Sequence, residues 1–203
     1  MFHALANPGR FHRLSTSLLP FLAVGCLLSF AAGLYLAWFA SPPDYQQGHT
    51  VLIMYIHVPA AWFAMGIYAF MGLCSLVFLV WRHPLADVLA RSSAPVGALF
   101  TAICLITGAL WGKPMWGAYW VWDARLTSML ILFFIYLGYL ALARQSDQDL
   151  ANQRICAYIN LVGLINLPII KFSVDWWNTL HQPASVFRMD GQPSPRKCCG
   201  HWS

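Results

Sequence analysis

Two histidines and a cluster of aromatic side chains are the residues of this sequence with the clearest chemical potential. The cluster spans residues 111–127 and reads WGKPMWGAYWVWDARLT. It contains the rings of Trp111, Trp116, Tyr119, Trp120 and Trp122 and the charged residues Lys113, Asp123 and Arg125. An ordinary connector is built from Gly, Pro, Asn, Asp and Ser. We therefore expect these rings to lie on a membrane surface, contact a partner or cover a flat apolar ligand.

The two histidines, His57 and His181, are predicted to lie at the same depth as the aromatic cluster. His57 stands two residues before Pro59, where an apolar run is predicted to begin, and His181 follows the last apolar run. Two imidazoles beside an aromatic floor suit haem, because its iron takes axial histidines and its ring needs a flat apolar site. Lys113 and Arg125 could then pair with the haem propionates.

Each of these residues also has a plainer interpretation. A histidine at a boundary is often an interfacial polar residue, and tryptophans there can anchor the chain in the interface or bind a partner. The two cations can contact water or lipid headgroups. Asp123 precedes an apolar run and is predicted to cap the helix that follows. The residues alone leave the ligand site and the interfacial anchor as alternatives.

The composition is that of a membrane protein. Of 203 residues, 59% are hydrophobic and only 9% are charged, whereas soluble domains have about 25% charged residues. Mean hydropathy is +0.58. The net charge of +5 is then expected to record membrane orientation, since no nucleic-acid motif accompanies it. Four cysteines in or beside apolar runs are predicted to be small buried residues: Cys26, Cys74, Cys104 and Cys156.

Five apolar runs predict an all-α polytopic membrane protein with five transmembrane helices. The runs cover residues 18–40, 59–81, 94–111, 124–143 and 155–172, and about 20 residues suffice to span a bilayer core. Pro59 is predicted to open the second helix, and Pro168 to kink or end the fifth. The connectors are predicted at 41–58, 82–93, 112–123 and 144–154.

Basic residues predict how the helices are oriented. One side of the predicted spans holds Arg10, Arg13, Arg82, Arg91, Arg144 and Arg154. The positive-inside rule places that side and the N-terminus in the cytoplasm, and the aromatic cluster and the segment after Lys171 outside. Nearly all tryptophans except Trp81 then lie at the outer face. Aromatic belts normally mark both interfaces, so the outer face is predicted to need aromatic surface for another reason.

Six motifs spread over residues 15–185 share a resemblance to one known family. They are PDYQQG at 43–48, YIHVPAA at 55–61, WGKPMW at 111–116, WGAYWVWDARLT at 116–127, NLPII at 166–170 and WWNTLHQ at 176–182. The fourth is similar to the tryptophan-rich "WWD" signature of haem-handling proteins, and the set resembles the cytochrome c maturation protein C, or haem exporter protein C, family. Tyr119 stands where that family commonly has another tryptophan.

The resemblance implies a function and a site. Members are multi-pass proteins of the bacterial inner membrane, or mitochondrial equivalents, that hold haem b non-covalently at the periplasmic face. The axial ligands would be His57 and His181, with the aromatic cluster and its charged residues around the haem. The haem would pass to a periplasmic haem chaperone, cytochrome c maturation protein E. The family associates with an ABC-type transporter, and this sequence has no phosphate-binding loop of its own, so it is expected to have no catalytic residue and not to be an enzyme.

Residues 1–185 are expected to form a single haem-handling membrane domain, with the aromatic loop at 111–127. The family has six membrane helices, whereas residues 186–203 form an atypical polar tail without an apolar run. We expect loss of a sixth helix to loosen the surroundings of His181. Two other functions remain as alternatives: a b-type cytochrome or quinone-reactive anchor subunit, and a noncatalytic transporter subunit whose tryptophans bind partners.

Overall fold

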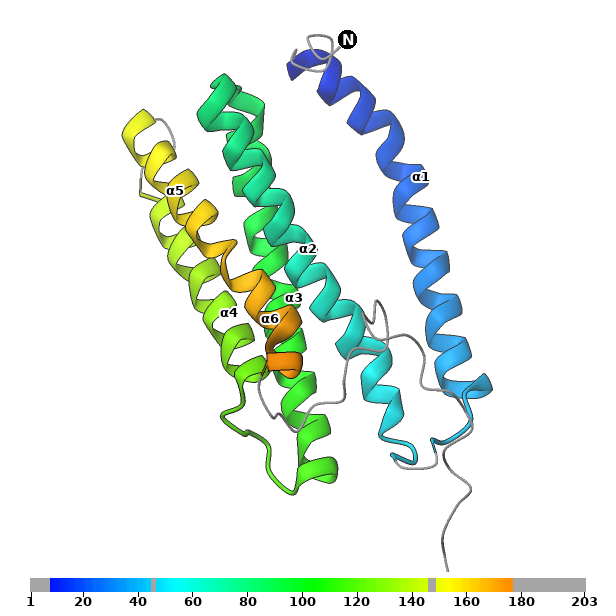
Figure 1. The fold of residues 1–203 in the computed structure, drawn as a ribbon. Coiled ribbons are helices and arrows are strands. Elements are labelled where there is room, and N and C mark those ends of the chain that lie inside the picture. Colours follow the sequence, from blue (N-terminus) through cyan, green and yellow to red (C-terminus); the bar gives the residue numbers. More distant parts are fainter. Residues whose placement is uncertain (1–7, 45–46, 146–148, 177–203) are drawn as a thin grey trace, which may run out of the picture.

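The computed structural model describes residues 8–44, 47–145 and 149–176, and this described part is helical without a strand (Figure 1). The helices are α1 (Pro8–Tyr35), α2 (Val51–Trp81), α3 (Pro84–Trp116), α4 (Ala124–Ala143), α5 (Leu150–Gly163) and α6 (Asn166–Trp176), and a π-helical turn, Leu36–Ala40, extends α1. Five stretches are long and apolar enough to cross a membrane, with α5 and α6 together forming the fifth. The predicted fold class of five membrane-spanning helices is confirmed.

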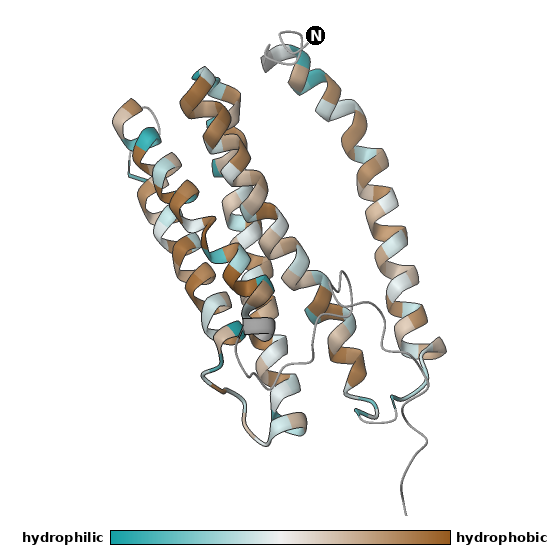
Figure 2. Cartoon of the chain, in the orientation of Figure 1, coloured by the Kyte–Doolittle hydropathy of each residue, from teal (hydrophilic) through white to brown (hydrophobic). Residues whose placement is uncertain are grey.

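Helices α2 to α6 form a bundle, and α1 lies apart from it (Figure 1). The membrane-length part of α1 has no buried residue, whereas each of the other four spans is partly buried. Figure 2 shows hydrophobic residues along the length of every helix, as expected for elements that face lipid outside and packed neighbours inside. The N-terminus of α1 and the α2–α3 turn lie at one end, and the α3–α4 loop lies at the other.

Two buried tyrosines join three helices at the centre of the bundle. Tyr68 of α2 and Tyr136 of α4 are fully buried, and their rings meet edge to face with centroids 5.1 Å apart. The Tyr136 hydroxyl donates to the carbonyl oxygen of Ala64 at 2.8 Å, and the Tyr68 hydroxyl donates to that of Asn160 at 3.2 Å. A bilayer core offers no water to satisfy polar groups, so these bonds make the polar ends of both rings compatible with burial.

Small side chains allow α2 and α3 to pack closely. Ala60 and Ala64 of α2 and Ala94 of α3 are buried, and small residues let membrane helices bring their backbones together. Gly97 of α3 lies against the hydroxyl end of Tyr136, so that a Cβ atom there would overlap the ring. The position of Tyr136 therefore depends on the absence of a side chain at residue 97.

The start of α2 differs from the prediction. The helix begins at Val51 and Pro59 lies in its interior, so the prediction that Pro59 opens the helix is wrong. Residues 51–58 read VLIMYIHV and are apolar enough to continue the span. Membrane helices tolerate interior prolines because neighbouring groups satisfy the freed backbone carbonyl. The connector predicted at 41–58 therefore ends at residue 50.

The start of α3 also differs, because a charged pair lies inside the helix. The predicted connector 82–93 reduces to Arg82 and His83, since α3 begins at Pro84. Arg91 Nε donates to the Asp87 carboxylate at 2.8 Å, and Arg91 Nη1 donates to the carbonyl oxygen of Ala143 at 2.8 Å. The two charges compensate each other one turn apart, which makes their presence in a helix compatible with membrane packing.

The predicted effect of Pro168 is confirmed. The fifth span breaks at Leu164 and Ile165, between α5 and α6. A helical proline has no N–H to donate and its ring clashes with the carbonyl four residues earlier, which here belongs to Leu164. That carbonyl instead accepts from the N–H of Leu167 at 3.1 Å. The side-chain amide of Asn166 donates to the Ser128 carbonyl at 2.8 Å and holds the break against α4.

We predict that Gly97→Ala destabilises the bundle by about 1–3 kcal/mol, the usual cost of overpacking. The new Cβ would meet Tyr136, which is buried and hydrogen-bonded and has no room to move. Reversible unfolding in mixed detergents measures the change. Gly138→Ala on α4 is the matched control, because a Cβ there meets nothing within 4 Å. Equal losses in the two variants would contradict this account.

Candidate functional site

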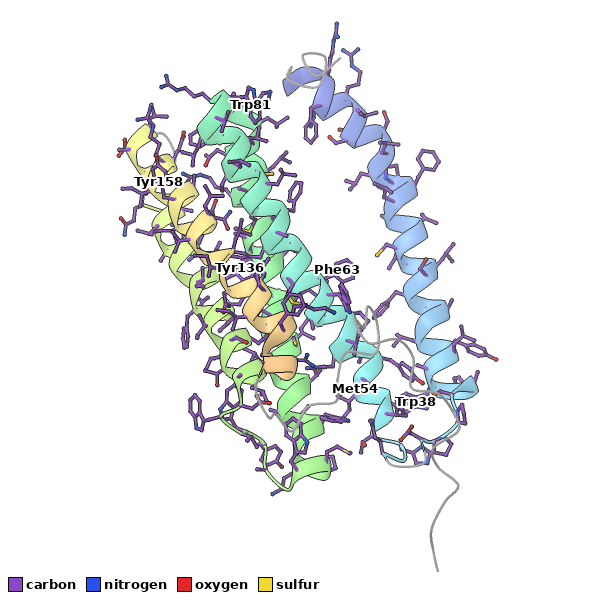
Figure 3. All side chains as sticks on the ribbon, viewed as in Figure 1. Trp38, Met54, Phe63, Trp81, Tyr136 and Tyr158 are labelled. Atoms are coloured by element: carbon purple, nitrogen blue, oxygen red, sulfur yellow. The ribbon has the colours of Figure 1, made fainter. Side chains whose placement is uncertain are left out.

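The predicted site residues that the structure describes gather at the end of the bundle where α2 begins and α3 ends. We call this end, with its rings Trp111, Trp116, Tyr119, Trp120 and Trp122, the aromatic end. Figure 3 shows Met54 and Trp38 near it and Trp81 at the opposite end. Helix α6 ends at Trp176, and the predicted ligand His181 lies outside the described residues.

His57 is held by two acceptors on α3. Its Nδ1 lies 3.0 Å from the backbone carbonyl oxygen of Cys104 and 3.1 Å from the hydroxyl oxygen of Thr107. A carbonyl oxygen can only accept, so Nδ1 must carry the proton and donate. In the neutral ring Nε2 is then the nitrogen with the lone pair. This is the arrangement that metal-ligating histidines use, with one nitrogen donating to a carbonyl or another acceptor.

His57 belongs to the second turn of α2 and not, as predicted, to a connector before it. Its side chain is half-buried. Measured along the helix from Trp81, residue 57 lies about 36 Å away at ~1.5 Å per residue. A hydrocarbon core is about 30 Å thick. His57 is therefore farther from Trp81 than a hydrocarbon core is thick, and its place near a membrane boundary stays a prediction.

Trp111 and Trp116 lie on the last turns of α3 instead of on a loop. Trp111 is buried, its indole N–H donates to the side-chain oxygen of Gln47 at 3.0 Å, and its ring meets that of Trp116 edge to face at 5.2 Å. Gly112 leaves space for this pair, since a Cβ there would come within 3.1 Å of the Trp116 ring. Trp111 thus fastens the connector before α2 onto α3.

The irregular part of the predicted aromatic loop is only residues 117–123. Gly117 ends α3 with φ at +79°, a conformation that favours glycine. Trp120 and Trp122 meet edge to face at 5.6 Å, and Trp122 is 76% exposed and Tyr119 is 57% exposed. The indole nitrogen of Trp120 is buried without an acceptor among the described residues. This short loop therefore leaves large rings uncovered and one donor unsatisfied.

The three charged residues of the cluster have different surroundings. Asp123 accepts from the backbone N–H of Leu126 at 2.8 Å, which confirms that it caps α4. Lys113 donates to the Gly117 carbonyl at 3.1 Å, and its ammonium lies 5.2 Å from the centroid of the Tyr119 ring. Arg125 is half-buried on the first turn of α4. Lys113 and Arg125 thus provide positive charge at the aromatic end, whereas Asp123 has a structural role.

Three further residues complete this end and had no site role in the sequence prediction: Gln47, Cys104 and Thr107. Gln47 belongs to one of the family-like motifs, which was the only signal for it. Thr107 and Cys104 lie about fifty residues from His57 in the chain. Nothing local in the sequence links them to it, since the contact exists only once α2 packs on α3.

Two hollows lie away from this group. One, of about 590 Å³, is at the opposite end and is lined by Arg82, Asp87, Arg91 and Gln153 among others. The other, of about 560 Å³, follows one face of α2 past Pro59, Trp62 and Phe70. Neither lining includes His57 or the 117–123 loop. Among the described residues, the candidate site consists of the exposed rings of the 117–123 loop and the imidazole of His57, which is held on α2 against Cys104 and Thr107.

Fold and site together define a multi-pass α-helical membrane protein with exposed aromatic rings at one end and a histidine held through Nδ1 between α2 and α3. The family described as heme exporter protein C (CcmC) matches residues 1–199. The heme exporter protein C of Bradyrhizobium diazoefficiens is 60% identical over 92% of this chain and 71% of its own length. The heme exporter protein C of Escherichia coli K12 is 44% identical over 96% of this chain and 79% of its own length. A ccmC-like mitochondrial cytochrome c biosynthesis protein of Marchantia polymorpha is 53% identical over 79% and 68%. The chain therefore belongs to the heme exporter protein C family, as the motifs predicted.

We predict that two tryptophans of the aromatic end contribute very differently to stability. Trp111→Ala should destabilise the bundle by about 3–5 kcal/mol, the usual cost of removing a buried ring, because Trp111 is buried and hydrogen-bonded to Gln47. Trp122→Ala should change stability by less than about 0.5 kcal/mol, as is usual for exposed positions. Unfolding in mixed detergents measures both. A large loss in Trp122→Ala would show that the exposed ring has a structural role.

Proposed function

We propose that this protein binds haem at the outer face of the bacterial inner membrane and passes it to a haem chaperone during assembly of c-type cytochromes. Two relatives are named heme exporter protein C and a third is a cytochrome c biosynthesis protein. Haem is the cargo of this protein and stays non-covalently bound as haem b. The protein acts as a transport component and performs no chemical transformation itself.

The observation that supports this proposal most directly is the hydrogen bond from His57 Nδ1 to the Cys104 carbonyl oxygen, 3.0 Å long. It leaves the lone pair of a neutral imidazole on Nε2, at a predicted membrane boundary and in the same half of the bundle as the exposed rings. Iron of haem takes such a nitrogen as an axial ligand. His181 is proposed as the second ligand on the strength of its family-like motif, since it lies outside the described residues.

The other side chains of the aromatic end fit a flat, acidic ligand. Tyr119 and Trp122 are exposed rings on a short loop, and flat apolar ligands bind preferentially against aromatic side chains. Trp120 has a buried N–H in need of an acceptor. Lys113 and Arg125 supply cations suited to propionates. Trp111 and Trp116 are proposed to support this surface from below, and Asp123 to fix the start of α4.

The partners follow from the same family. A haem chaperone, cytochrome c maturation protein E, would receive the haem at the aromatic end, where the ligand is reachable from outside the membrane. An ABC-type transporter would associate with the membrane helices and use ATP. α1 is exposed along its whole membrane length, so it has surface that lipid or the helices of such a transporter can cover.

The first test is the absorbance spectrum of the chain purified in mild detergent and loaded with haem. We expect low-spin bands that are lost or shifted in His57→Ala and in His181→Ala. The affinity loss should exceed the ~10–100-fold that removal of an outer-shell partner costs, because a direct ligand is lost. His49→Ala is the matched control, since His49 is exposed in the connector before α2. Unchanged bands in His57→Ala would contradict the proposal.

A second measurement separates haem handover from electron transfer. A haem carrier should release its haem to the soluble domain of the chaperone, which is followed as loss of the bound spectrum. A b-type cytochrome or quinone-reactive subunit should instead keep its haem and be reduced rapidly by quinol. Retention of haem with fast quinol reduction would favour that second function over the proposed one.

A further inference from the structure

We propose that Thr107 is a positioning residue for His57. Together with the Cys104 carbonyl it holds the imidazole as the Nδ1–H tautomer, which leaves Nε2 as the only ring nitrogen able to bind iron. This proposal rests on the proposed function, because it concerns how the ligand is prepared for haem. The tautomer itself is a property of the protein without haem and can be tested separately.

The hydroxyl of Thr107 donates its proton within α3, which determines how it can interact with His57. Thr107 Oγ1 donates to the carbonyl oxygen of Ile103 at 2.7 Å, with a longer alternative to that of Cys104 at 3.2 Å. Its only proton is thus directed at its own helix. Its oxygen can therefore act toward His57 only as an acceptor, at 3.1 Å from Nδ1. The hydrogen bond to Ile103 keeps this acceptor in place, and serine can form the same bond.

The Cys104 carbonyl requires the Nδ1–H tautomer, and the Thr107 hydroxyl favours it. The Cys104 carbonyl oxygen has no proton to give, and the Thr107 proton is used within α3. An imidazole with its proton on Nε2 would bring the Nδ1 lone pair against the lone pairs of the Cys104 carbonyl oxygen, which repel it. The Thr107 hydroxyl would have to leave Ile103 to donate to that nitrogen, and the nearby Cys104 thiol, 3.8 Å away, is only a weak donor. The two contacts therefore favour the Nδ1–H form together, and neither has to do so alone.

Gly108 allows the ring to lie this close to α3. A Cβ at residue 108 would come within 3.0 Å of His57 Cε1, whereas Nε2 would be 4.0 Å away. Alanine at this position would press on the edge of the ring next to Nδ1 and lengthen the contacts with Cys104 and Thr107. The turn from Cys104 to Gly108 thus forms a cradle: two acceptors and a bare backbone position facing one imidazole.

The cradle has consequences for a bound iron. An acceptor on the second nitrogen of a ligating histidine fixes ring orientation and raises its basicity. Removing the Thr107 oxygen should weaken haem binding about tenfold, at the lower end of the ~10–100-fold range for outer-shell partners, because the Cys104 carbonyl remains. A less basic ligand stabilises ferric iron less, so the midpoint potential should move upward.

The test compares Thr107→Val, Thr107→Ser and Thr101→Val with the parent chain. Thr101 is the matched control, since it is buried on α3 and donates to the Gly97 carbonyl at 2.7 Å in the same manner. In the haem-free protein, ¹⁵N NMR of labelled imidazoles reports the tautomer, and the His57 signals are those lost in His57→Ala. We expect the Nδ1–H form in the parent, an increased Nε2–H fraction in Thr107→Val, and parent-like signals in the other two.

Haem titration and redox titration of the same four proteins complete the test. Thr107→Val should bind haem about tenfold more weakly with a raised potential, while Thr107→Ser and Thr101→Val should match the parent. An Nε2–H tautomer in the parent, or equal behaviour of Thr107→Val and Thr101→Val, would overturn the proposal. A parent that binds no haem would refute the proposed function, and the NMR comparison would still decide whether Thr107 sets the tautomer.

Discussion

The close packing of α2 on α3 is the contact on which the candidate site depends. Helix α2 contacts α3 more extensively than any other helix, and the small residues Ala60 and Ala64 of α2 are buried in the bundle. Gly97 of α3 leaves space for the Tyr136 hydroxyl that bonds to Ala64. Lipid gives membrane helices no hydrophobic reason to associate, so close van der Waals contact and interhelical hydrogen bonds have to hold them together. The same closeness, continued toward the aromatic end, brings the His57 ring against the backbone of α3. A wider helix pair would leave that imidazole without its acceptors.

The number and type of helices could be predicted from the sequence, because an uncharged run long enough to span a bilayer has few other solutions. The helix ends were harder. The sequence predicts a helix start at Pro59 and a connector at Asp87 and Arg91, yet all three residues lie inside helices. A proline or a charged residue ends a membrane helix only if the free energy of burying it there is not offset by neighbouring groups. Arg91 meets its cost through Asp87 and the end of α4, a tertiary arrangement that is not visible in a linear pattern. Asp123 was predictable as a cap because capping is a local interaction.

The candidate site was likewise predictable in part. His57 and the tryptophans could be found from residue type and motif, but their individual roles could not. Trp111 and Trp122 look equivalent in the sequence, and one is buried on α3 while the other is exposed on the loop. The difference arises because α3 continues to Trp116, so that position along a helix decides which ring faces its neighbours. The contact of Thr107 with His57 could not be predicted for a related reason. A threonine in an apolar run has no distinguishing local feature, and the contact forms only when α2 packs beside α3.

A protein that carries haem and then gives it up has to meet two opposing demands, and the aromatic end separates them in space. Its histidine is held by rigid elements: two long helices, a backbone carbonyl and a threonine whose proton is already used. Its exposed rings instead belong to a loop of seven residues, 117–123, whose outermost side chains, Tyr119 and Trp122, have little protein around them. If His57 binds haem as proposed, its fixed imidazole lowers the entropic cost of capture, because it needs no reorientation. Under the proposed function, the exposed rings would cover one apolar face of the haem without enclosing it, so that a chaperone could replace them one contact at a time. Burying the whole ligand would strengthen binding but would also require the bundle to open before transfer. A held histidine together with exposed rings would avoid that requirement, which is how the proposed function accounts for this arrangement.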